Sequence, residues 1–559
     1  MATSHKYFLI AGLSGLLLAL SYPGWDFDLG FLAWFGLIPF FWSFSRVVSE
    51  HDRARKLHVF FIGFAAGLVY FLIIFRWFWS IYPLDTLGIE SRLVSFIGVL
   101  LIYLISSTGM ALFWGLFGLV TGNWLLATGK SKPYRLLTIP ALFVLLEYAR
   151  SWGFGFLWAG SSSLFGPHWT LGNLAYSLAN NSLALKLTSL VGIYGVMFVI
   201  VLINCLAFII LKNGSQTFST SPRITLGIKM TLVVLMLVTL NFLGPKLIKP
   251  QTIEQGGGNA KKINFAVIQT TQPTKSIYTS KEILSGLEEQ LKLLARVAKE
   301  SPESQLIVFP ETSELLKNIS LFMTSAQAKE YFNNLFEEPK LIIAGGRVFD
   351  ANGRAYSRVF DLDTQNDIIN YYDKQLLTPG GEFLPYPIKL IAWLFSKTTT
   401  TEYDSLREFN VGAKDVSTVN FREQFKAAPM ICSELLSPGL TKQTSQNSDV
   451  LISMASYGIF HGNPVIARQM LAATRFRAAE TAKPVITSAN MGLSYMIDSQ
   501  GNIAYLAQNQ TPQILTGSVV LDPRETWYNK VGDLPIILVS LLLIISLIFL
   551  TWFSGIRRP

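Results

Sequence analysis

Residues 428–434 read Ala428-Pro429-Met430-Ile431-Cys432-Ser433-Glu434. This short apolar run is typical of a strand, and it delivers one thiol at its end. Cys432 is one of two cysteines in the chain, and the other, Cys205, lies in an unbroken apolar segment. Most free cysteines are small buried hydrophobes, whereas a thiol displayed where a strand gives way to a turn can be a nucleophile. Both interpretations of Cys432 stay open on this stretch alone.

The composition indicates a membrane protein that carries a soluble part. Of the 559 residues, 50% are hydrophobic and 15% are charged, which is too apolar for an ordinary soluble protein, and the chain is too long for one domain. The net charge of +10 does not indicate nucleic-acid binding, because the basic residues cluster in short loops between apolar segments. The two cysteines lie in such different surroundings that we expect no disulfide.

Apolar runs that are long enough to cross a bilayer, about 20 residues each, recur along the chain. They lie near 6–22, 30–46, 57–79, 93–126, 133–150, 187–211, 225–244 and 532–553. The run at 93–126 is long enough for a span plus an interfacial piece, and the first run could also be a secretory signal peptide. The sequence predicts seven transmembrane helices in residues 1–246 and an eighth in residues 531–559.

Basic residues predict the orientation of these helices. The loops on the side of the N-terminus hold Arg46, Arg53, Arg55, Lys56, Lys130, Lys132, Arg135, Lys212, Arg223, Lys229, Arg557 and Arg558. The opposite loops hold only Arg76, Arg92, Arg150 and Lys186. Because positive loops stay in the cytoplasm, residues 247–530 are expected outside, in the periplasm of a Gram-negative host. We therefore expect a multi-pass protein of the bacterial inner (cytoplasmic) membrane.

Residues 247–530 predict a layered α/β domain. A polar, glycine-containing linker at 254–262 comes before it. Strand-like runs follow at 263–268, 305–309, 340–345, 355–362, 425–432, 449–454 and 484–489. Helices are expected at 281–298, which is amphipathic, and after Asn463, with Pro464 in the first turn. Strands that alternate with helices are typical of an α/β fold with its own core.

Three polar residues stand beside strand-like runs and could act together. The Glu311 carboxylate can take a proton from the Cys432 thiol, the Lys374 ammonium can stabilise an oxyanion, and the thiolate can attack an acyl carbon. Each residue also has a simpler explanation: Glu311 could cap a helix starting at Thr312, and Lys374 could be a solvated loop charge. Spacing along the chain does not decide between these alternatives.

The order of several motifs carries a resemblance. The motifs are Pro310-Glu311, Lys374, Pro379-Gly380-Gly381-Glu382-Phe383-Leu384-Pro385 and Cys432-Ser433-Glu434. In combination they resemble the nitrilase superfamily, which has a Glu-Lys-Cys triad and a second glutamate after the lysine. A domain of this kind set among membrane spans is similar to the membrane-bound acyltransferases of that superfamily, and the resemblance covers essentially the whole chain.

The resemblance implies a fold, a reaction and roles for residues. The fold would be a polytopic α-helical membrane domain of about eight spans plus a nitrilase-like αββα sandwich, with no cofactor or metal. Glu311 would be the general base, Lys374 the oxyanion stabiliser and Cys432 the nucleophile, with Glu382 and Glu434 in support. Cys432 would take an acyl chain from a membrane phospholipid as a thioester. The acceptor would be the N-terminal amine of a diacylglyceryl-modified cysteine on an apolipoprotein.

The sequence departs from the family pattern at several positions. Ser433 stands where an aromatic residue is common, residues 453–457 read Ser-Met-Ala-Ser-Tyr in place of Asn-Asp-Ala-Trp-Phe, and Gly155-Phe156-Leu157-Trp158 lacks the usual proline. These departures concern substrate contacts more than the triad. The apolar segment 384–395, which includes Trp393, is expected either on the membrane surface beside the site or in the core of the soluble domain.

Rival functions share much of this sequence evidence. A membrane-tethered amidase or other nitrilase-type hydrolase would use the same triad with water as the acceptor, and an inactive scaffold would keep only the fold. A transporter is less favoured, because Glu147 is the main ionisable residue inside the apolar runs and could pair with Arg150.

Overall fold

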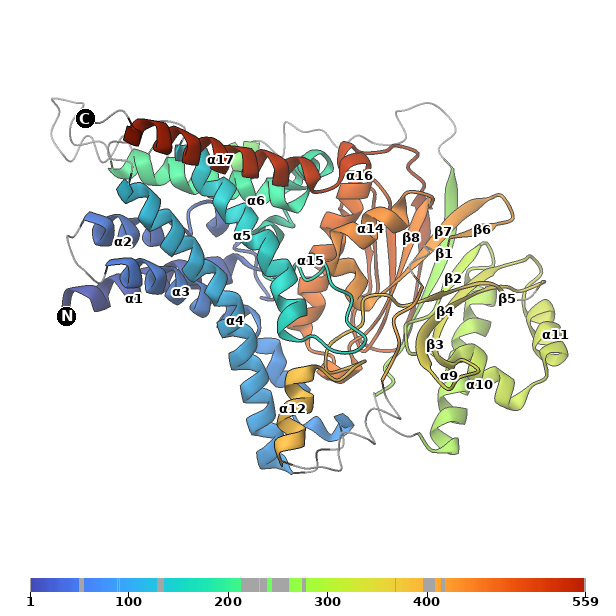
Figure 1. The fold of residues 1–559 in the computed structure, drawn as a ribbon. Coiled ribbons are helices and arrows are strands. Elements are labelled where there is room, and N and C mark those ends of the chain that lie inside the picture. The colour runs from blue at the N-terminus through green and yellow to red at the C-terminus, as the bar shows by residue number, and fades with distance from the viewer. Residues whose placement is uncertain are drawn as a thin grey trace.

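The computed structural model describes most of the chain. The described residues are 2–49, 55–87, 89, 91–127, 135–212, 231, 239–243, 261–273, 278–366, 368–395, 408–413 and 418–556. Figure 1 shows a bundle of long helices joined to a pair of sheets that are flanked by helices. Each part corresponds to one half of the predicted organisation.

The helical part is built from the N-terminal half of the chain and its C-terminal helix. Its α-helices are α1 (Ala2–Ser21), α2 (Ile38–Ser49), α3 (Arg55–Ile74), α4 (Arg92–Ala127), α5 (Arg135–Leu157), α6 (Ser182–Lys212) and α17 (Leu534–Ile556). Shorter helices connect or follow them: η1 (Gly30–Trp34), η2 (Arg76–Ile81), η3 (Leu84–Leu87), η4 (Leu174–Leu178) and η5 (Thr239–Leu243).

Within the described ranges, four stretches are long and apolar enough to cross a membrane. They are Gly30–Val48, Lys56–Ile74, Arg92–Gly122 and Ser182–Lys212. Two shorter apolar helices, His5–Ser21 and Leu534–Leu550, accompany them. This set is consistent with a membrane domain but is smaller than the predicted eight spans. The run at 225–244 and the linker at 254–262 lie outside the described residues, apart from 231, 239–243, 261 and 262.

The other part is a sandwich of two sheets, each with six strands in the described residues. The first has the order β12-β1-β2-β3-β4-β5 and the second β11-β10-β9-β8-β7-β6. The strands of the first sheet are β1 (Lys262–Gln269), β2 (Leu306–Val308), β3 (Leu341–Phe349), β4 (Ala355–Asp363), β5 (Ile368–Asp373) and β12 (Gln513–Val520). Those of the second are β6 (Val419–Phe421), β7 (Phe425–Ile431), β8 (Val450–Ser456), β9 (Val485–Asn490), β10 (Tyr495–Ile497) and β11 (Ile503–Leu506).

Helices cover the outer face of each sheet, which gives four layers. Helices α9 (Ser280–Glu300), α10 (Leu315–Phe322) and α11 (Ser325–Leu335) pack their apolar side chains on the first sheet. Helices α14 (Pro438–Ser445) and α15 (Pro464–Thr481) pack on the second. The inner faces of the two sheets meet in a separate core that contains Phe265, Val308, Ile343, Ile431 and Ile486. The predicted nitrilase-like α/β arrangement is therefore present.

Local sequence explains where the sandwich helices begin. Thr279 and Glu282 form a reciprocal capping box at the start of α9. Asn463 accepts a hydrogen bond from the Val465 backbone N–H at 2.8 Å, and Pro464 occupies the first turn of α15, as predicted. Short helices complete this part: α12 (Tyr386–Phe395), α16 (Trp527–Val531), η7 (Cys432–Leu436) and η8 (Gly458–Phe460).

The two parts of the molecule meet along α15. This helix packs against the second sheet on one side and against α6 of the bundle on the other. One continuous apolar core therefore runs from the membrane helices to the outer face of the second sheet. The sandwich is held against the bundle by a buried interface.

Candidate active site

Cys432 lies at a sharp turn between strand and helix. Strand β7 ends at Ile431, one residue earlier than predicted, and Cys432 opens η7 with a φ of +47°. A left-handed conformation costs a residue with a side chain about 1–2 kcal/mol, so the surroundings must hold this turn in place. Pro429 is tolerated in the strand because, among the described residues, β6 pairs only with Phe425–Ala427 and no described residue of β6 pairs with residue 429.

Glu434 stabilises the start of this turn by hydrogen bonds. Its side chain is 1% exposed and accepts four hydrogen bonds. The donors are the Ile431 N–H (2.7 Å), the Gln375 N–H (2.7 Å), the Leu376 N–H (3.4 Å) and the Tyr372 hydroxyl (2.7 Å). Burial raises the pKa of Glu434, and the donors oppose that rise. This carboxylate therefore ties η7 to the chain that follows β5.

Lys374 lies between two carboxylates. It follows directly after β5, and its Nζ lies 2.9 Å from Glu311 Oε1 and 2.9 Å from Glu382 Oε2. The Lys374 side chain is 1% exposed and that of Glu311 10%. Burial lowers the pKa of Lys374, but Glu311 and Glu382 outweigh it, so the net pKa lies well above the ordinary value. Lys374 is a charged, buried ammonium at neutral pH.

The second carboxylate is fixed by a turn of its own. Glu382 Oε2 accepts a hydrogen bond from the Thr378 N–H at 2.7 Å. Within the same turn, the Gly380 N–H donates to the Phe383 carbonyl at 2.8 Å, and Gly380 has a φ of +78° that favours glycine. Gly380 of the predicted motif thus shapes the loop that presents Glu382 to Lys374.

Cys432 is electrostatically coupled to this cluster. Burial and the Glu311 carboxylate raise the pKa of the Cys432 thiol to about 12, and Lys374 opposes the rise. A hydrogen bond from the backbone of Ser456, the last residue of β8, also favours the thiolate. The structure therefore gathers Glu311, Lys374, Glu382 and Cys432 at one end of the sandwich.

Glu311 has the properties of a proton acceptor. Burial raises its pKa to about 7, Lys374 opposes that rise, and Glu382 adds to it. A group that titrates near neutral pH can both take and return a proton. The arrangement supplies a thiol, a base for its proton and a cation for a developing oxyanion, which together suit acyl transfer.

The simpler explanations of two residues are wrong. Glu311 does not cap a helix at Thr312, because α10 begins at Leu315 and Glu314 precedes it. Lys374 is not a solvated loop charge, since it is buried in an ion-pair cluster. Cys432 is partly exposed, unlike the buried Cys205, and both thiols are free.

Some residues that shape the site were not predicted from the sequence. Ser456 contacts the thiol through its backbone, Thr378 orients Glu382, and the Ser433 hydroxyl donates to the Leu376 carbonyl at 2.5 Å. Because two of these contacts use the backbone N–H, residue identity carries no signal for them. Among the described residues, no group of three or more His, Cys, Asp or Glu side chains is placed to bind a metal ion.

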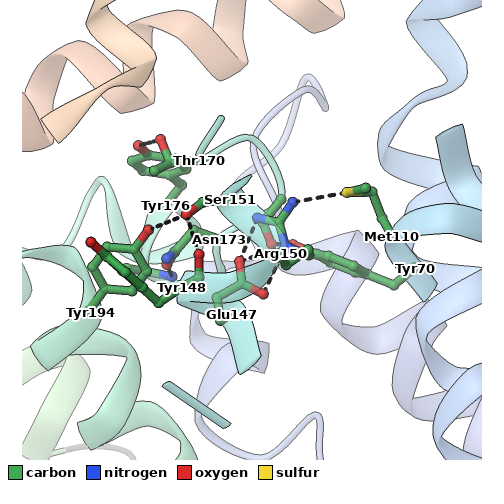
Figure 2. A network of polar contacts seen from close by, with 12 residues as sticks. Tyr70, Met110, Glu147, Tyr148, Arg150, Ser151, Thr170, Asn173, Tyr176 and Tyr194 are labelled. Atoms are coloured by element: carbon green, nitrogen blue, oxygen red, sulfur yellow. Dashed lines mark hydrogen bonds and ion pairs between the residues drawn. The ribbon is translucent and has the colours of Figure 1, made fainter. Parts of the chain in front are cut away.

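The ionisable pair in the bundle forms as expected. Arg150 Nε donates to both oxygens of Glu147, at 2.9 and 2.8 Å, and both side chains are buried in α5 (Figure 2). A neutralised pair inside the bundle does not favour transport.

Comparisons with known proteins agree with this architecture. Residues 14–206 match the family described as apolipoprotein N-acyltransferase N-terminal domain, and residues 264–529 match carbon-nitrogen hydrolase. The apolipoprotein N-acyltransferase of Geobacter metallireducens is 26% identical, covering 95% of this chain and 93% of that protein. The one from Borreliella burgdorferi is 23% identical, covering 97% and 96%. The solved structure of Saccharomyces cerevisiae Nit3, of the nitrilase superfamily, covers 49% of this chain and 95% of its own, at a TM-score of 0.35 and 15% identity.

The carbon-nitrogen hydrolase match and the names of the relatives identify an acyltransferase of the carbon-nitrogen hydrolase class, and the apolar bundle fits a membrane-associated protein. Within this class, the two matched regions and the relatives that cover nearly the whole chain all point to one family. The chain belongs to the apolipoprotein N-acyltransferase family.

Proposed function

We propose that this protein transfers an acyl chain from a membrane phospholipid to the N-terminal amine of a diacylglyceryl-modified cysteine on an apolipoprotein. The observation that carries the proposal is the Lys374 ammonium, held between Glu311 and Glu382 beside the strained turn at Cys432. The names of the full-length relatives support the acceptor class. The phospholipid donor and the residue roles are part of the proposal.

In the first half-reaction, Glu311 takes the thiol proton of Cys432 while the sulfur attacks the ester carbonyl of the phospholipid. Lys374 stabilises the oxyanion of the tetrahedral intermediate. The intermediate collapses to a thioester, and the departing lysophospholipid oxygen takes the proton back from Glu311. Glu382 keeps Lys374 in place, and Glu434 keeps the turn that carries Cys432 in place.

In the second half-reaction, the amine of the acceptor attacks the thioester. Glu311 takes one proton from the attacking nitrogen, and Lys374 again stabilises the oxyanion. The C–S bond then breaks, the Cys432 sulfur regains the proton, and the product carries a new amide. The enzyme returns to its starting protonation state after each cycle.

We also propose a topology for the chain in the inner membrane. Residues 1–246 and 531–559 would supply eight spans, and residues 247–530 would form the catalytic domain on the periplasmic side. Helix α12 would lie at the membrane surface, since it leaves Tyr386 and Leu390 exposed beside the site. Its backbone is tied to the helical part, because the Tyr386 N–H donates to the Ala159 carbonyl at 2.7 Å.

A direct test is to look for the thioester. Purified protein in detergent is incubated with phospholipid, and intact mass spectrometry is expected to show one added acyl group that is absent in Cys432→Ser. Addition of a diacylated lipopeptide should discharge it as an acyl amide. Release of free fatty acid without amide would identify a hydrolase, and absence of any adduct on a folded protein would refute the catalytic role of Cys432.

A further inference from the structure

The loop between α5 and η4, residues 158–173, comes from the helical part and contacts both segments that carry site residues. On one side, the Ala159 carbonyl accepts the Tyr386 N–H just after the Glu382 turn. On the other side, the loop contacts the end of η7, the short helix that begins at Cys432. None of the residues in this loop takes part in the two proposed half-reactions.

Two consecutive residues at the end of η7 are held by this loop. The Thr170 hydroxyl donates to the Leu436 carbonyl at 2.5 Å, and His168 Nδ1 lies 2.8 Å from the Ser437 hydroxyl. The last carbonyls of a helix have no partner within that helix, so Thr170 supplies one. Burial lowers the pKa of His168 to about 4, which keeps its ring neutral in this contact.

The direction of these hydrogen bonds is set by proton count. Thr170 Oγ1 also lies 2.7 Å from the Tyr176 hydroxyl (Figure 2). A hydroxyl has one proton, and the Leu436 carbonyl can only accept, so Thr170 donates to Leu436 and Tyr176 donates to Thr170. Hydrogen bonds therefore run from the Tyr176 hydroxyl of η4 to Thr170, and from Thr170 to the Leu436 carbonyl at the end of η7.

The loop is itself anchored in the helical bundle. The Trp169 N–H donates to the Ser151 carbonyl at 3.2 Å, and the Tyr70 hydroxyl donates to the Gly172 carbonyl at 3.0 Å. Ser151 Oγ accepts from the Tyr194 hydroxyl at 3.0 Å, as Figure 2 shows. The support that Thr170 gives to η7 therefore originates in α3, α5 and α6.

We propose that Thr170, with His168, is a positioning residue for Cys432. Glu434 fixes the N-terminal end of η7 and Thr170 fixes its C-terminal end. These contacts at the two ends of the strained turn are called the clamp below. The clamp keeps the sulfur near Lys374 and the Ser456 backbone, although Thr170 touches no reacting atom. This inference rests on the proposed role of Cys432 as nucleophile.

The test uses full-length protein in which Cys205→Ala leaves Cys432 as the single thiol. Thr170→Val removes the hydroxyl at nearly constant shape, and Thr170→Ser keeps it. Thr481→Val is the matched control, because Thr481 is also buried and donates to a backbone carbonyl, that of Arg477 at 2.9 Å. Each variant is measured for iodoacetamide alkylation at a fixed, mildly alkaline pH and for acyl-transfer kinetics.

For Thr170→Val we expect kcat to fall about tenfold with KM unchanged, because small displacements of a nucleophile are costly. Alkylation should slow about threefold, which corresponds to half a pKa unit of lost thiolate stabilisation. Thr170→Ser and Thr481→Val should match the parent protein. Equal values for Thr170→Val and Thr481→Val, or a loss in Thr170→Ser as large as in Thr170→Val, would overturn the proposal.

Alkylation separates this inference from the proposed function. If the parent protein transfers no acyl group but Thr170→Val still slows alkylation, the clamp stands and the proposed function fails. Should Thr170→Val not fold, His168→Ala removes the neighbouring contact to Ser437 from a partly exposed position. Slower alkylation in His168→Ala supports the clamp, and unchanged alkylation overturns it.

Discussion

Replacing Glu382 with glutamine should move the pH dependence of catalysis in a defined direction. In the native protein the pKa of Glu311 is raised to about 7, first by burial, with Lys374 opposing and Glu382 adding to the rise. If Glu311 is the base, kcat/KM for thioester formation increases as the pH passes upward through about 7, because the base must be ionised in the free enzyme. Glu382→Gln removes one negative charge from this cluster.

The magnitude follows from the geometry. Each carboxylate has an oxygen 2.9 Å from Lys374 Nζ, so those two oxygens are no more than about 6 Å apart. At an effective dielectric constant of about 20, two unit charges at that separation repel by about 3 kcal/mol, or about two pKa units. The pKa of Glu311 should therefore fall from about 7 toward about 5 in Glu382→Gln.

The assay is single-turnover acylation of Cys432 by a fluorescent phospholipid, measured across the pH range in which the protein stays folded. Asp373→Asn is the matched control, because Asp373 is as exposed as Glu382, adjoins Lys374 and is paired with Arg358 outside the cluster. We expect a midpoint near 7 for the native protein and Asp373→Asn, and a lower midpoint for Glu382→Gln. A midpoint that stays in place or rises in Glu382→Gln would refute the electrostatic account of the site.

Two further predictions concern other buried carboxyl groups. Glu434→Gln keeps one acceptor oxygen and turns an amide N–H₂ either toward the Ile431 N–H, which donates to Oε2, or toward the donors of Tyr372, Gln375 and Leu376, which share Oε1. At least one charge-assisted hydrogen bond worth about 1.5–3 kcal/mol is therefore lost. The rate of thioester formation should drop, and a native rate would contradict the role of this side chain. Asp361 in β4 is fully buried, neither of its oxygens has a hydrogen-bond partner among the described residues, and burial raises its pKa from 3.8 to about 8. Because the folded-state pKa is raised, the contribution of Asp361 to stability is fully present below pH 3.8 and is lost as the pH rises to about 8. Near neutral pH the loss amounts to about 4 kcal/mol. Asp361→Asn should remove most of that pH dependence in thermal unfolding, and parallel pH curves for the two proteins would show the reasoning to be wrong.

Motif order singled out residues that the structure brings together, whereas the contacts around them could not be predicted from local pattern. Glu311, Lys374, Glu382 and Cys432 could be chosen because each carries a side chain with a recognisable chemical role. The Ser456 and Thr378 contacts use backbone N–H groups, which any residue except proline supplies, so sequence contained no signal for them. Thr170 lies in the loop after α5, and its link to η7 exists only because the two parts of the fold are packed together.

The same contrast holds for the fold. Buried central strands such as β1, β2 and β8 are nearly continuous apolar runs and were predicted. Strand β5 was not among the strand ranges expected for the domain, because it lies at the edge of its sheet and only one of its six side chains is buried. Segment 384–395 was expected as a surface loop or a core segment, and residues 386–395 instead form the helix α12. In such a short apolar run, periodicity does not separate these outcomes.

The resting charge state of the site bears on how the reaction begins. With a thiol pKa of about 12 and a Glu311 pKa of about 7, Cys432 is a neutral thiol at rest, and moving its proton to Glu311 costs at most about 7 kcal/mol. The transfer leaves the net charge of the cluster unchanged. Because the Glu311 charge is one cause of the high thiol pKa, neutralising Glu311 reduces that cost. A turnover of about 10 per second corresponds to a barrier of about 16 kcal/mol, so this step fits within an ordinary enzymatic barrier. The thiolate would then form only during attack, and the resting thiol would be protected from adventitious oxidation.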